Sequence, residues 1–347
     1  MPVDLDSIAS SSATHPDRLH SLPILILNVH ENCNCHCVMC DIWKRPGGAE
    51  LNLDMLSRMR HSLKTLGVRQ VVLTGGEPLL HTRFEDLCGL LREDDLRITL
   101  LTSGLLLQKR SESVAAWIDD VIVSLDGPEA VHDSIRGVKR GFDLISSGIL
   151  AVRRHRSGMP VHARSTVQRR NFNCLRATVA AAKLLHFDSI SFLAADVISQ
   201  AFNRELVWPV ERQADIALAP SEVAVLENEI ELLIDQCHAE ISEHFIAESP
   251  EKLRRIARRF REYVGELSPE APICNAPWVS AVMEIDGSVR PCFFHRKIGN
   301  AQHGTLEAAI NSPDALHFRQ TLDIKQDPIC QRCVCSLNYR SPKSIGD

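Results

Sequence analysis

The sequence predicts an α/β fold in which helices cover a parallel sheet, as in a complete or partial barrel of six strand–helix units. Two observations support this prediction. Between residues 24 and 193, six short apolar runs alternate with segments whose apolar residues recur at helical spacing. Polar or glycine-containing turns follow several of these runs, at the carboxyl ends of the expected strands, where α/β barrels carry their active sites.

The composition argues against several classes of protein. A chain of 347 residues with 44% hydrophobic residues can bury a sizeable core, so disorder is not expected. A net charge of −5 with 5% aromatic residues provides neither the basic surface nor the stacking side chains typical of nucleic-acid binding. We therefore expect a small molecule or a peptide as the substrate, and no nucleic acid as a partner.

The chain begins with a polar segment, residues 1–20, which is expected to be flexible. It lacks the basic start and apolar core of a secretory signal, and no apolar run is long enough to cross a membrane. Twelve cysteines in a chain of this kind favour metal or redox chemistry over disulfides. These features predict a cytoplasmic protein with no membrane partner.

Strands and helices are expected to alternate along the barrel domain, residues 21–196. The first run follows Pro23, is almost wholly apolar as expected of a strand buried on both faces, and leads into the first cysteines. The expected strands cover residues 24–29, 71–73, 98–101, 121–125, 161–167 and 190–193, and the expected helices cover 53–66, 84–91, 113–117, 142–153 and 175–185.

After residue 196 the alternation stops. Residues 197–270 are expected to form a helical insert, with one long helix that is capped by Ser221 and lined by apolar residues as far as Ile241. A second helix is expected from Pro250 to Val264, and its five arginines, which have glutamates nearby, predict a solvated and partly paired face. Residues 271–347 are short-stranded and rich in cysteine, and they are expected to form a small second domain.

Four of the twelve cysteines lie within eight residues, directly after the first expected strand. Cys33, Cys37 and Cys40 are separated by three and then two residues, a trio suited to a soft metal bound by thiolates, typically iron in a cluster. Three protein ligands would leave one iron open to a substrate or cofactor. The alternative is a structural zinc site with His36 or Cys35 as the fourth ligand.

Small and polar residues follow the second, third and fourth expected strands. Paired glycines allow a ligand to approach the backbone closely, although such turns also occur as simple connections. Because these loops meet on one face of a barrel, their shared location favours a common ligand. The residues are Gly75, Gly76, Glu77 and Pro78 after the second strand, Ser103 after the third, and Ser124 and Asp126 at the end of the fourth.

These motifs, in this order, resemble those of the radical S-adenosylmethionine (SAM) enzymes. The resemblance covers about residues 24–195 and implies a partial (β/α)6 barrel of the radical SAM type. It also implies that Cys33, Cys37 and Cys40 bind a [4Fe–4S] cluster, that SAM chelates the open iron, and that a flavodoxin- or ferredoxin-type protein donates electrons.

The same resemblance assigns residues to parts of SAM. Ser103 is expected to contact the cofactor, although it departs from the family pattern, which often has an asparagine at this position. By similarity, Gly75, Gly76 and Glu77 of the turn that ends at Pro78 meet the SAM amino group, Ser124 and Asp126 meet its ribose, and Arg164, or alternatively Arg136, meets its carboxylate.

A second group of cysteines lies near the carboxyl terminus. Residues 279–285 and 289–294 are expected to form a β-hairpin around Asp286-Gly287, which would bring Cys274 and Cys292 together. With Cys330 and Cys333 they supply four thiolates, enough to close a cluster. The arrangement resembles the twitch extension, a shortened SPASM domain with one auxiliary [4Fe–4S] cluster; the alternative is a zinc ribbon.

The resemblance implies a radical SAM oxidoreductase that abstracts hydrogen from a small polar metabolite such as a sugar, an aminocyclitol or a nucleoside-like compound. The auxiliary cluster would accept an electron from the substrate radical, and Asp196, just beyond the last strand, is the candidate catalytic residue. Alternatives are a peptide-modifying maturase, a radical epimerase, decarboxylase or carbon–carbon bond-forming enzyme, and a noncatalytic iron–sulfur or zinc protein.

Overall fold

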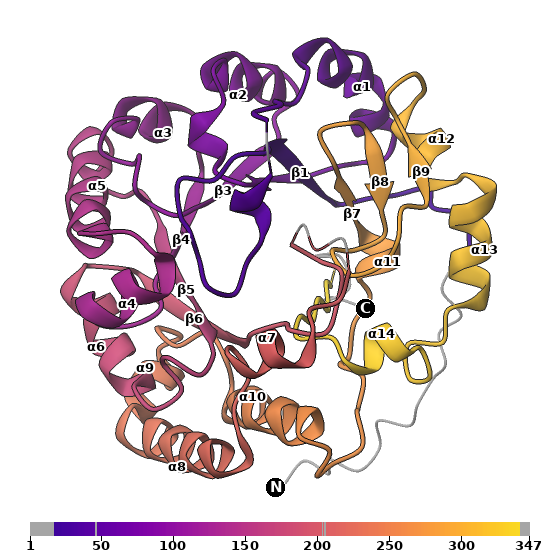
Figure 1. Cartoon of the computed structure of the whole chain (residues 1–347). Helices are drawn as coiled ribbons and strands as arrows, with labels where there is room; N and C mark the ends of the chain where they lie inside the picture. The colour runs from indigo at the N-terminus through magenta and orange to yellow at the C-terminus, as the bar shows by residue number, and fades with distance from the viewer. Residues whose placement is uncertain (1–16, 46, 203, 205, 341–347) are drawn as a thin grey trace, which may run out of the picture.

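The computed structural model describes residues 17–45, 47–202, 204 and 206–340. Most of the segment predicted to be flexible, residues 1–16, lies outside this part. The core is a single nine-stranded sheet with the order β6-β5-β4-β3-β2-β1-β7-β8-β9. All neighbours from β6 to β7 run parallel, and helices surround the curved sheet (Figure 1). The predicted α/β fold with a parallel sheet is confirmed.

The six predicted barrel strands are all present, with ends that differ from the predictions by at most two residues. They are β1 (Ile24–His30), β2 (Gln70–Gly75), β3 (Arg97–Thr102), β4 (Asp120–Ser124), β5 (Val161–Val167) and β6 (Ser189–Ala194). In β1, Leu25 and Leu27 are fully buried, whereas Ile26 is half-buried and lines a cavity. The expectation that β1 is buried on both faces is therefore wrong, because one face borders the barrel interior.

The five predicted barrel helices are also present, as α1 (Leu53–Thr65), α2 (Phe84–Arg92), α3 (Ser111–Trp117), α5 (Gly141–His155) and α6 (Leu175–Leu184). Two short 3-10 helices, Ile42–Lys44 and Pro78–Leu80, and one further α-helix, α4 (Glu129–Arg136), were not predicted. Pro128 precedes α4, and Gly137 ends it in the left-handed conformation at φ 64°.

The segment after β6 is helical, with α7 (Val210–Ala214), α8 (Pro220–Gln236), α9 (His238–Ser242) and α10 (Pro250–Tyr263). The predicted cap at Ser221 is wrong. Pro220 takes the first helical position, so Ala219 is the capping residue and its backbone N–H donates to Glu222 Oε2 at 2.8 Å. The long helix also ends earlier than predicted, before Cys237. Four of the five arginines of α10 pair with glutamates, in line with the predicted partly paired face: Arg254 contacts Glu231, Arg258 and Arg259 contact Glu262, and Arg261 contacts Glu227.

The cysteine-rich segment begins with α11 (Ala276–Val279) and forms the predicted hairpin from β7 (Ser280–Met283) and β8 (Ser288–Arg290), followed by β9 (Gly299–Asn300). Three short helices complete it: α12 (Leu306–Ile310), α13 (Pro313–Thr321) and α14 (Pro328–Gln331). The sequence did not predict that β7 pairs with β1, so that the second domain extends the barrel sheet. None of the described helices has the length and apolar character needed to span a membrane.

Candidate active site

The first cysteine loop follows β1 at the carboxyl end of the sheet. Cys37 and Cys35 are buried, and Cys33 and Cys40 are half-buried. Hydrogen bonding with Cys33 and Cys37 on either side, together with burial, raises the pKa of the Cys35 thiol. Burial, with further contributions from the charges of Cys37 and Cys33, raises the pKa of the Cys40 thiol to about 12. A crowded, desolvated set of thiols of this kind fits a bound iron cluster, because metal binding stabilises the thiolate form.

The unpredicted helix α4 holds this loop in place. The backbone N–H of His36 donates to the carbonyl of Arg136 at 2.9 Å, and the N–H of Val38 donates to the carbonyl of Ile135 at 3.0 Å. A Cβ atom on Gly137 would lie 2.8 Å from the carbonyl oxygen of His36. The last turn of α4 therefore supplies two acceptors to the loop, and glycine allows the close approach.

Arg136 lies directly beside the cysteine trio. Its Nη1 is 3.5 Å from the Cys37 thiol, and its Nε is 2.6 Å from Asp126 Oδ2. Hydrogen bonding to Cys35 and, against the effect of burial, the charge of Arg136 lower the pKa of the Cys37 thiol to about 6. The hydrogen bond with Cys35 and the adjacent guanidinium therefore favour the thiolate form of Cys37.

Arg164, the first candidate for the SAM carboxylate, lies elsewhere. It is an exposed side chain on β5 that donates from Nε to Ser191 Oγ at 3.3 Å, and it lines the cavity of the second cysteine group. Of the two arginines, Arg136 contacts the first cysteine loop. The geometry therefore favours Arg136 as the residue that faces a cofactor bound there.

Two backbone hydrogen bonds join the glycine turn, which contains Gly75 and Gly76, to the start of the cysteine loop. The N–H of Gly76 donates to the carbonyl of His30, and that of Glu77 donates to the carbonyl of Asn32, both at 2.8 Å. A Cβ atom on Gly76 would lie 2.0 Å from the Asn32 carbonyl oxygen. Glycine is therefore required here by the contact between two loops, a tertiary reason that the sequence alone does not reveal.

Glu77 is fully buried, and each of its two carboxylate oxygens accepts two hydrogen bonds. Oε1 accepts hydrogen bonds from the Thr102 hydroxyl at 2.8 Å and from the N–H of Leu79 at 3.1 Å. Oε2 accepts from the N–H and the hydroxyl of Ser103, at 2.8 and 2.6 Å, and the Ser103 hydroxyl also lies 3.0 Å from Asn34 Oδ1. Glu77 and Ser103 thus join β2 and β3 to the cysteine loop, and Pro78 begins the next turn.

Asp126 and Ser124 differ in their surroundings although both end β4. Asp126 is fully buried; Oδ1 accepts from the N–H of Thr166 at 2.8 Å, and Oδ2 pairs with Arg136. Ser124 is half-buried at the strand end. Asp126 therefore orients Arg136, whereas Ser124 lies in register with Arg164 of the neighbouring strand β5.

Asp196 forms a buried ion pair with Arg204. Its Oδ2 lies 2.6 Å from Arg204 Nη1 and 2.5 Å from the Ser199 hydroxyl, and both charged side chains are at most 3% exposed. Arg204 also donates to the carbonyl of Met39, next to Cys40, at 3.3 Å. This geometry argues against the prediction that Asp196 faces the substrate. The Asp196–Arg204 pair instead contacts the cysteine loop through the bond from Arg204 to Met39.

Phe202, two residues before Arg204, contacts residues next to both groups of cysteines. The N–H of Asp41 donates to the carbonyl of Phe202 at 3.3 Å, and the ring of Phe202 meets that of Phe294 edge-on at 6.2 Å. Phe294 is two residues beyond Cys292. Phe202 thus contacts Asp41, next to Cys40, and Phe294, two residues after Cys292.

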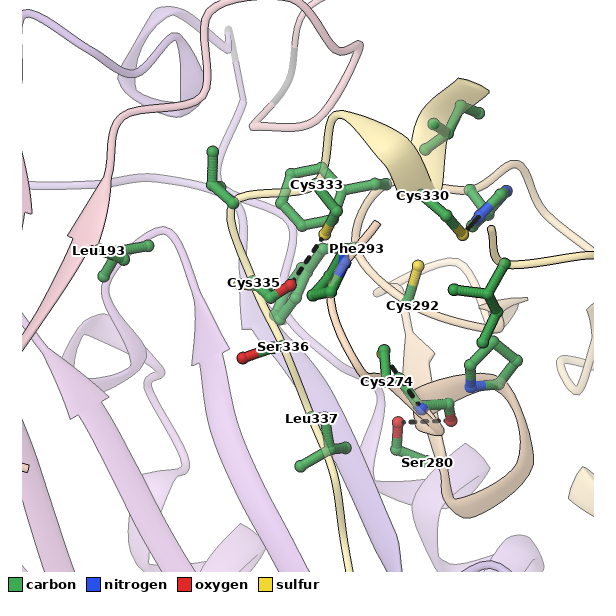
Figure 2. A pocket seen from close by; sticks show the side chains of 18 of the residues that line it. Leu193, Cys274, Ser280, Cys292, Phe293, Cys330, Cys333, Cys335, Ser336 and Leu337 are labelled. Carbon is green, nitrogen blue, oxygen red and sulfur yellow. Dashed lines mark hydrogen bonds between the residues drawn. The ribbon is translucent and has the colours of Figure 1, made fainter. Parts of the chain in front are cut away.

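The second group of cysteines surrounds a cavity of about 290 Å³ (Figure 2). Ile26, Arg164 and Leu193 line this cavity from the barrel strands, so it opens onto the barrel interior. Burial raises the pKa of the Cys292 thiol to about 11. The cysteines that line it are Cys274, Cys292, Cys330 and Cys333, as predicted, together with Cys335.

The spacing of these sulfurs favours a cluster over a single metal ion. Four thiolates on one zinc ion lie roughly 3.8 Å apart, given a zinc–sulfur distance of about 2.3 Å. Within the described part of the chain, the one group of three or more ligand atoms within 4.8 Å of one another is His295, Asp327 and Cys330. Within the described residues, no three sulfurs of either cysteine group thus lie within 4.8 Å of one another, and five thiols around one cavity suffice for one cluster.

Comparison with known proteins identifies both parts of the chain. Residues 27–169 match the radical SAM superfamily, and residues 274–334 match the SPASM iron–sulfur cluster-binding domain. The chain is 30% identical over 199 residues to the AdoMet-dependent heme synthase of Methanosarcina barkeri, covering 53% of this chain and 56% of that protein. It is 25% identical over 315 residues to the antilisterial bacteriocin subtilosin biosynthesis protein AlbA of Bacillus subtilis, covering 88% of this chain and 62% of AlbA. The chain thus spans less than two thirds of the length of either relative.

Solved structures share the fold at low sequence identity. SuiB of Streptococcus suis bound to SAM superposes with a TM-score of 0.62 at 15% identity, covering 92% of this chain and 74% of SuiB. The enzyme anSMEcpe with bound AdoMet and the Kp18Cys peptide superposes with a TM-score of 0.62 at 18% identity, covering 92% of this chain and 93% of that one.

The barrel, the cysteine trio and the superfamily match together define a radical SAM enzyme. Within that superfamily, the chain belongs with the proteins that carry a C-terminal SPASM-type domain. These two domains imply a [4Fe–4S] cluster with SAM in the barrel and auxiliary iron–sulfur binding in the second domain. The predicted family and cofactors are therefore confirmed.

Proposed function

We propose that this enzyme cleaves SAM reductively and oxidises a substrate held in the barrel interior between its two groups of cysteines. The observation that carries the proposal is the joint placement of these groups, with Phe202 in contact with residues beside both and the cavity of the second group lined by the barrel strands. When bound, the first cluster and SAM supply methionine and a 5′-deoxyadenosyl radical, which removes a hydrogen atom from the substrate.

The residues in and around the first cysteine loop divide into those that would bind the cluster or SAM and those that hold neighbouring loops in position. Cys33, Cys37 and Cys40 would hold the cluster, and Arg136 is placed to meet the SAM carboxylate. The backbone carbonyls of the Gly75–Gly76 turn are the acceptors for the SAM amino group, because the Glu77 carboxylate is already saturated. Ser124 would contact the ribose, while Ser103, Asp126 and Asp196 hold the surrounding loops.

An auxiliary cluster bound by the second group of cysteines would accept an electron from the substrate and so make the overall reaction an oxidation. Cys274, Cys292, Cys330 and Cys333 would hold one auxiliary cluster, with Cys335 as a fifth thiol nearby. A cluster held by these cysteines would serve as the acceptor for one electron from the substrate, which would also give up one hydrogen atom and one proton in a two-electron oxidation. A flavodoxin- or ferredoxin-type protein would supply the electron that cleaves SAM. Arg164, in the cavity wall, is placed to contact the substrate.

A peptide is the first candidate substrate. AlbA, which matches 88% of this chain, is named for the biosynthesis of the bacteriocin subtilosin. A small polar metabolite, such as a sugar, an aminocyclitol or a nucleoside-like compound, is the second candidate. The cavity of about 290 Å³ lies just below the range of roughly 300–1,000 Å³ for small-molecule pockets, so a metabolite bound there would have to be small.

Cysteine variants test the two groups separately under anaerobic conditions. Cys33→Ala should abolish formation of 5′-deoxyadenosine, whereas Cys292→Ala should retain it and lose the oxidised product. Cys237→Ala, at a half-buried helix end, is the matched control and should change neither. A cluster-loaded Cys33→Ala protein that still cleaved SAM would refute the ligand assignment. Transfer of deuterium from labelled candidate substrates into 5′-deoxyadenosine would identify the substrate.

A further inference from the structure

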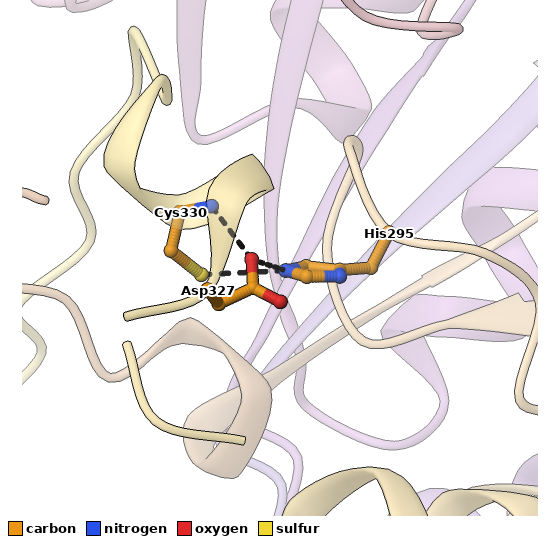
Figure 3. A group of neighbouring side chains, drawn as sticks. All are labelled: His295, Asp327 and Cys330. Carbon is orange, nitrogen blue, oxygen red and sulfur yellow. Dashed lines mark hydrogen bonds and ion pairs between the residues drawn. The ribbon is translucent and has the colours of Figure 1, made fainter. Parts of the chain in front are cut away.

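His295 lies beside one cysteine of the second group, and neither the sequence motifs nor the proposed reaction assigns it a role. It follows the hairpin three residues after Cys292, and its side chain is 5% exposed. Its Nε2 atom lies 3.3 Å from the Cys330 sulfur, across the cavity wall from the hairpin to α14 (Figure 3). The imidazole is therefore within hydrogen-bonding distance of a thiol that we assign to the auxiliary cluster.

The surroundings fix the position of the ring. Phe318 packs edge-on against the imidazole, with ring centroids 4.9 Å apart. Asp327 Oδ1 lies 3.7 Å from the same Nε2 atom. That carboxylate oxygen is itself held by the N–H groups of Ile329 and Cys330, at 3.0 and 2.8 Å. Asp327 and Cys330 therefore form a rigid unit at the start of α14 that faces one nitrogen of His295.

This arrangement selects a tautomer. The two groups that face Nε2, a thiolate and a carboxylate, are both acceptors of hydrogen bonds. An unprotonated Nε2 would direct its lone pair at two negative charges, whereas a protonated Nε2 donates to one and is attracted by the other. The proton of the neutral ring therefore belongs on Nε2, and the hydrogen bond does not require a charged imidazole.

We propose that His295 donates a hydrogen bond from Nε2 to the Cys330 thiolate and thereby raises the reduction potential of the auxiliary cluster. The proposal rests on the proposed role of Cys330 as a ligand. Hydrogen bonds to ligand sulfurs are among the factors that set cluster potentials. The reduced cluster carries one more negative charge than the oxidised cluster, so a donor at sulfur stabilises it more. His295 is thus a positioning residue that makes the second group a better electron acceptor.

The test measures the potential of the auxiliary cluster alone. In the full chain, Cys33, Cys37 and Cys40 are replaced together by alanine, so that iron reconstitution loads only the second group. The midpoint potential is then determined by a redox titration monitored by electron paramagnetic resonance. His295→Phe should shift it to a more negative value with unchanged cluster content, and His295→Gln, which keeps a donor, should shift it less. His303→Phe, at an exposed position, should leave it unchanged.

The outcomes separate this proposal from the assignment of Cys330. An unchanged potential in both His295 variants, with full cluster content, would overturn the hydrogen-bond role. Strong nitrogen coupling to the cluster in the protein with His295 intact would also overturn it, because His295 would then be a ligand. If Cys330→Ala in the same background keeps both cluster content and spectrum, the ligand assignment itself fails, whatever the His295 variants show.

Discussion

At the scale of single residues, the pair formed by Arg136 and Asp126 has a structural role that can be measured without any cofactor. Asp126 is fully buried and Arg136 is 12% exposed. Replacing Arg136 by Met leaves a buried carboxylate without a counter-charge, which costs roughly 3–5 kcal/mol. We expect urea unfolding of the metal-free protein to show this loss, and Asp126→Asn added to Arg136→Met to restore most of it.

A surface pair provides the control for this prediction. Arg140 is 80% exposed and pairs with Asp143 at 3.0 Å. Exposed pairs contribute about 0–1 kcal/mol, so Arg140→Met should have little effect. Equal losses in the Arg136 and Arg140 variants would show that burial does not govern the Arg136 pair.

His132 should make the stability of the protein depend on pH. It is buried in α4 and accepts a hydrogen bond from the N–H of Asp126 at 3.2 Å. Burial, with the charge of Arg136, lowers its pKa to about 3. The unfolded chain binds a proton near pH 6.5 and the folded chain does not, so this contribution is complete above pH 6.5 and falls as the pH decreases toward 3. At pH 5 the loss is about 2 kcal/mol.

The measurement compares unfolding free energies at pH 7 and pH 5. His132→Gln should reduce the difference between the two pH values by about 2 kcal/mol, whatever its effect at pH 7. His155→Gln, at an exposed position, should leave the difference unchanged. A pH dependence that is the same in both variants and in the parent protein would exclude His132 as its source.

At the scale of elements, a single methyl group added at Gly137 should disturb the junction between α4 and the cysteine loop. Gly137 has φ 64°, and a Cβ there would lie 2.8 Å from the His36 carbonyl oxygen. Gly137→Ala should cost about 1–2 kcal/mol through its left-handed backbone and displace the loop. We expect slower formation of 5′-deoxyadenosine and less iron at the first cluster. Gly158→Ala is the control, because nothing lies within 4 Å of its Cβ position; similar effects in both variants would contradict a specific role of the junction.

The elements that the sequence predicts are those with strong local patterns. Strands such as β5 and helices such as α8 are long enough for the spacing of their apolar residues to reveal them. α4 is short and mostly polar, and it was missed, although Pro128 before it and Gly137 after it were the available signals. The segment around Phe202 has no regular pattern, and its contacts with the cysteine loop come from tertiary packing alone.

At the scale of the whole molecule, the sequence located the site better than it assigned roles within it. The first group of cysteines gathers because its members lie within eight residues of sequence, whereas the second gathers because the β7–β8 hairpin and the segment around α14 line one cavity. The roles of Asp126 and Asp196 depend on Arg136 and Arg204, whose ion pairs with them only the fold establishes. A motif residue at a strand end can thus hold a loop in place rather than touch a ligand, and burial separates the two cases.

The second domain shares the sheet of the barrel, so the two should unfold together. β7 pairs with β1 from Ser280 to Met283, and Asn28 Nδ2 donates to Glu284 Oε2 at 2.5 Å. Leu306 in α12 is fully buried, and Leu306→Ala should cost about 2–5 kcal/mol. If the sheet opens as one unit, the amides of β1 should lose as much protection from hydrogen exchange as those of β7 and β8.

Hydrogen-exchange mass spectrometry of the metal-free protein can compare peptides from β1 with peptides from β7 and β8. We expect the Leu306→Ala variant to lower the opening free energy of both sets by the same amount. Leu184→Ala, on a side chain of α6 that is 70% exposed, should lower neither. Loss of protection confined to β7 and β8 would show that the second domain opens independently. Equal loss would show that the cavity between barrel and second domain depends on one cooperative structure, because its walls come from both.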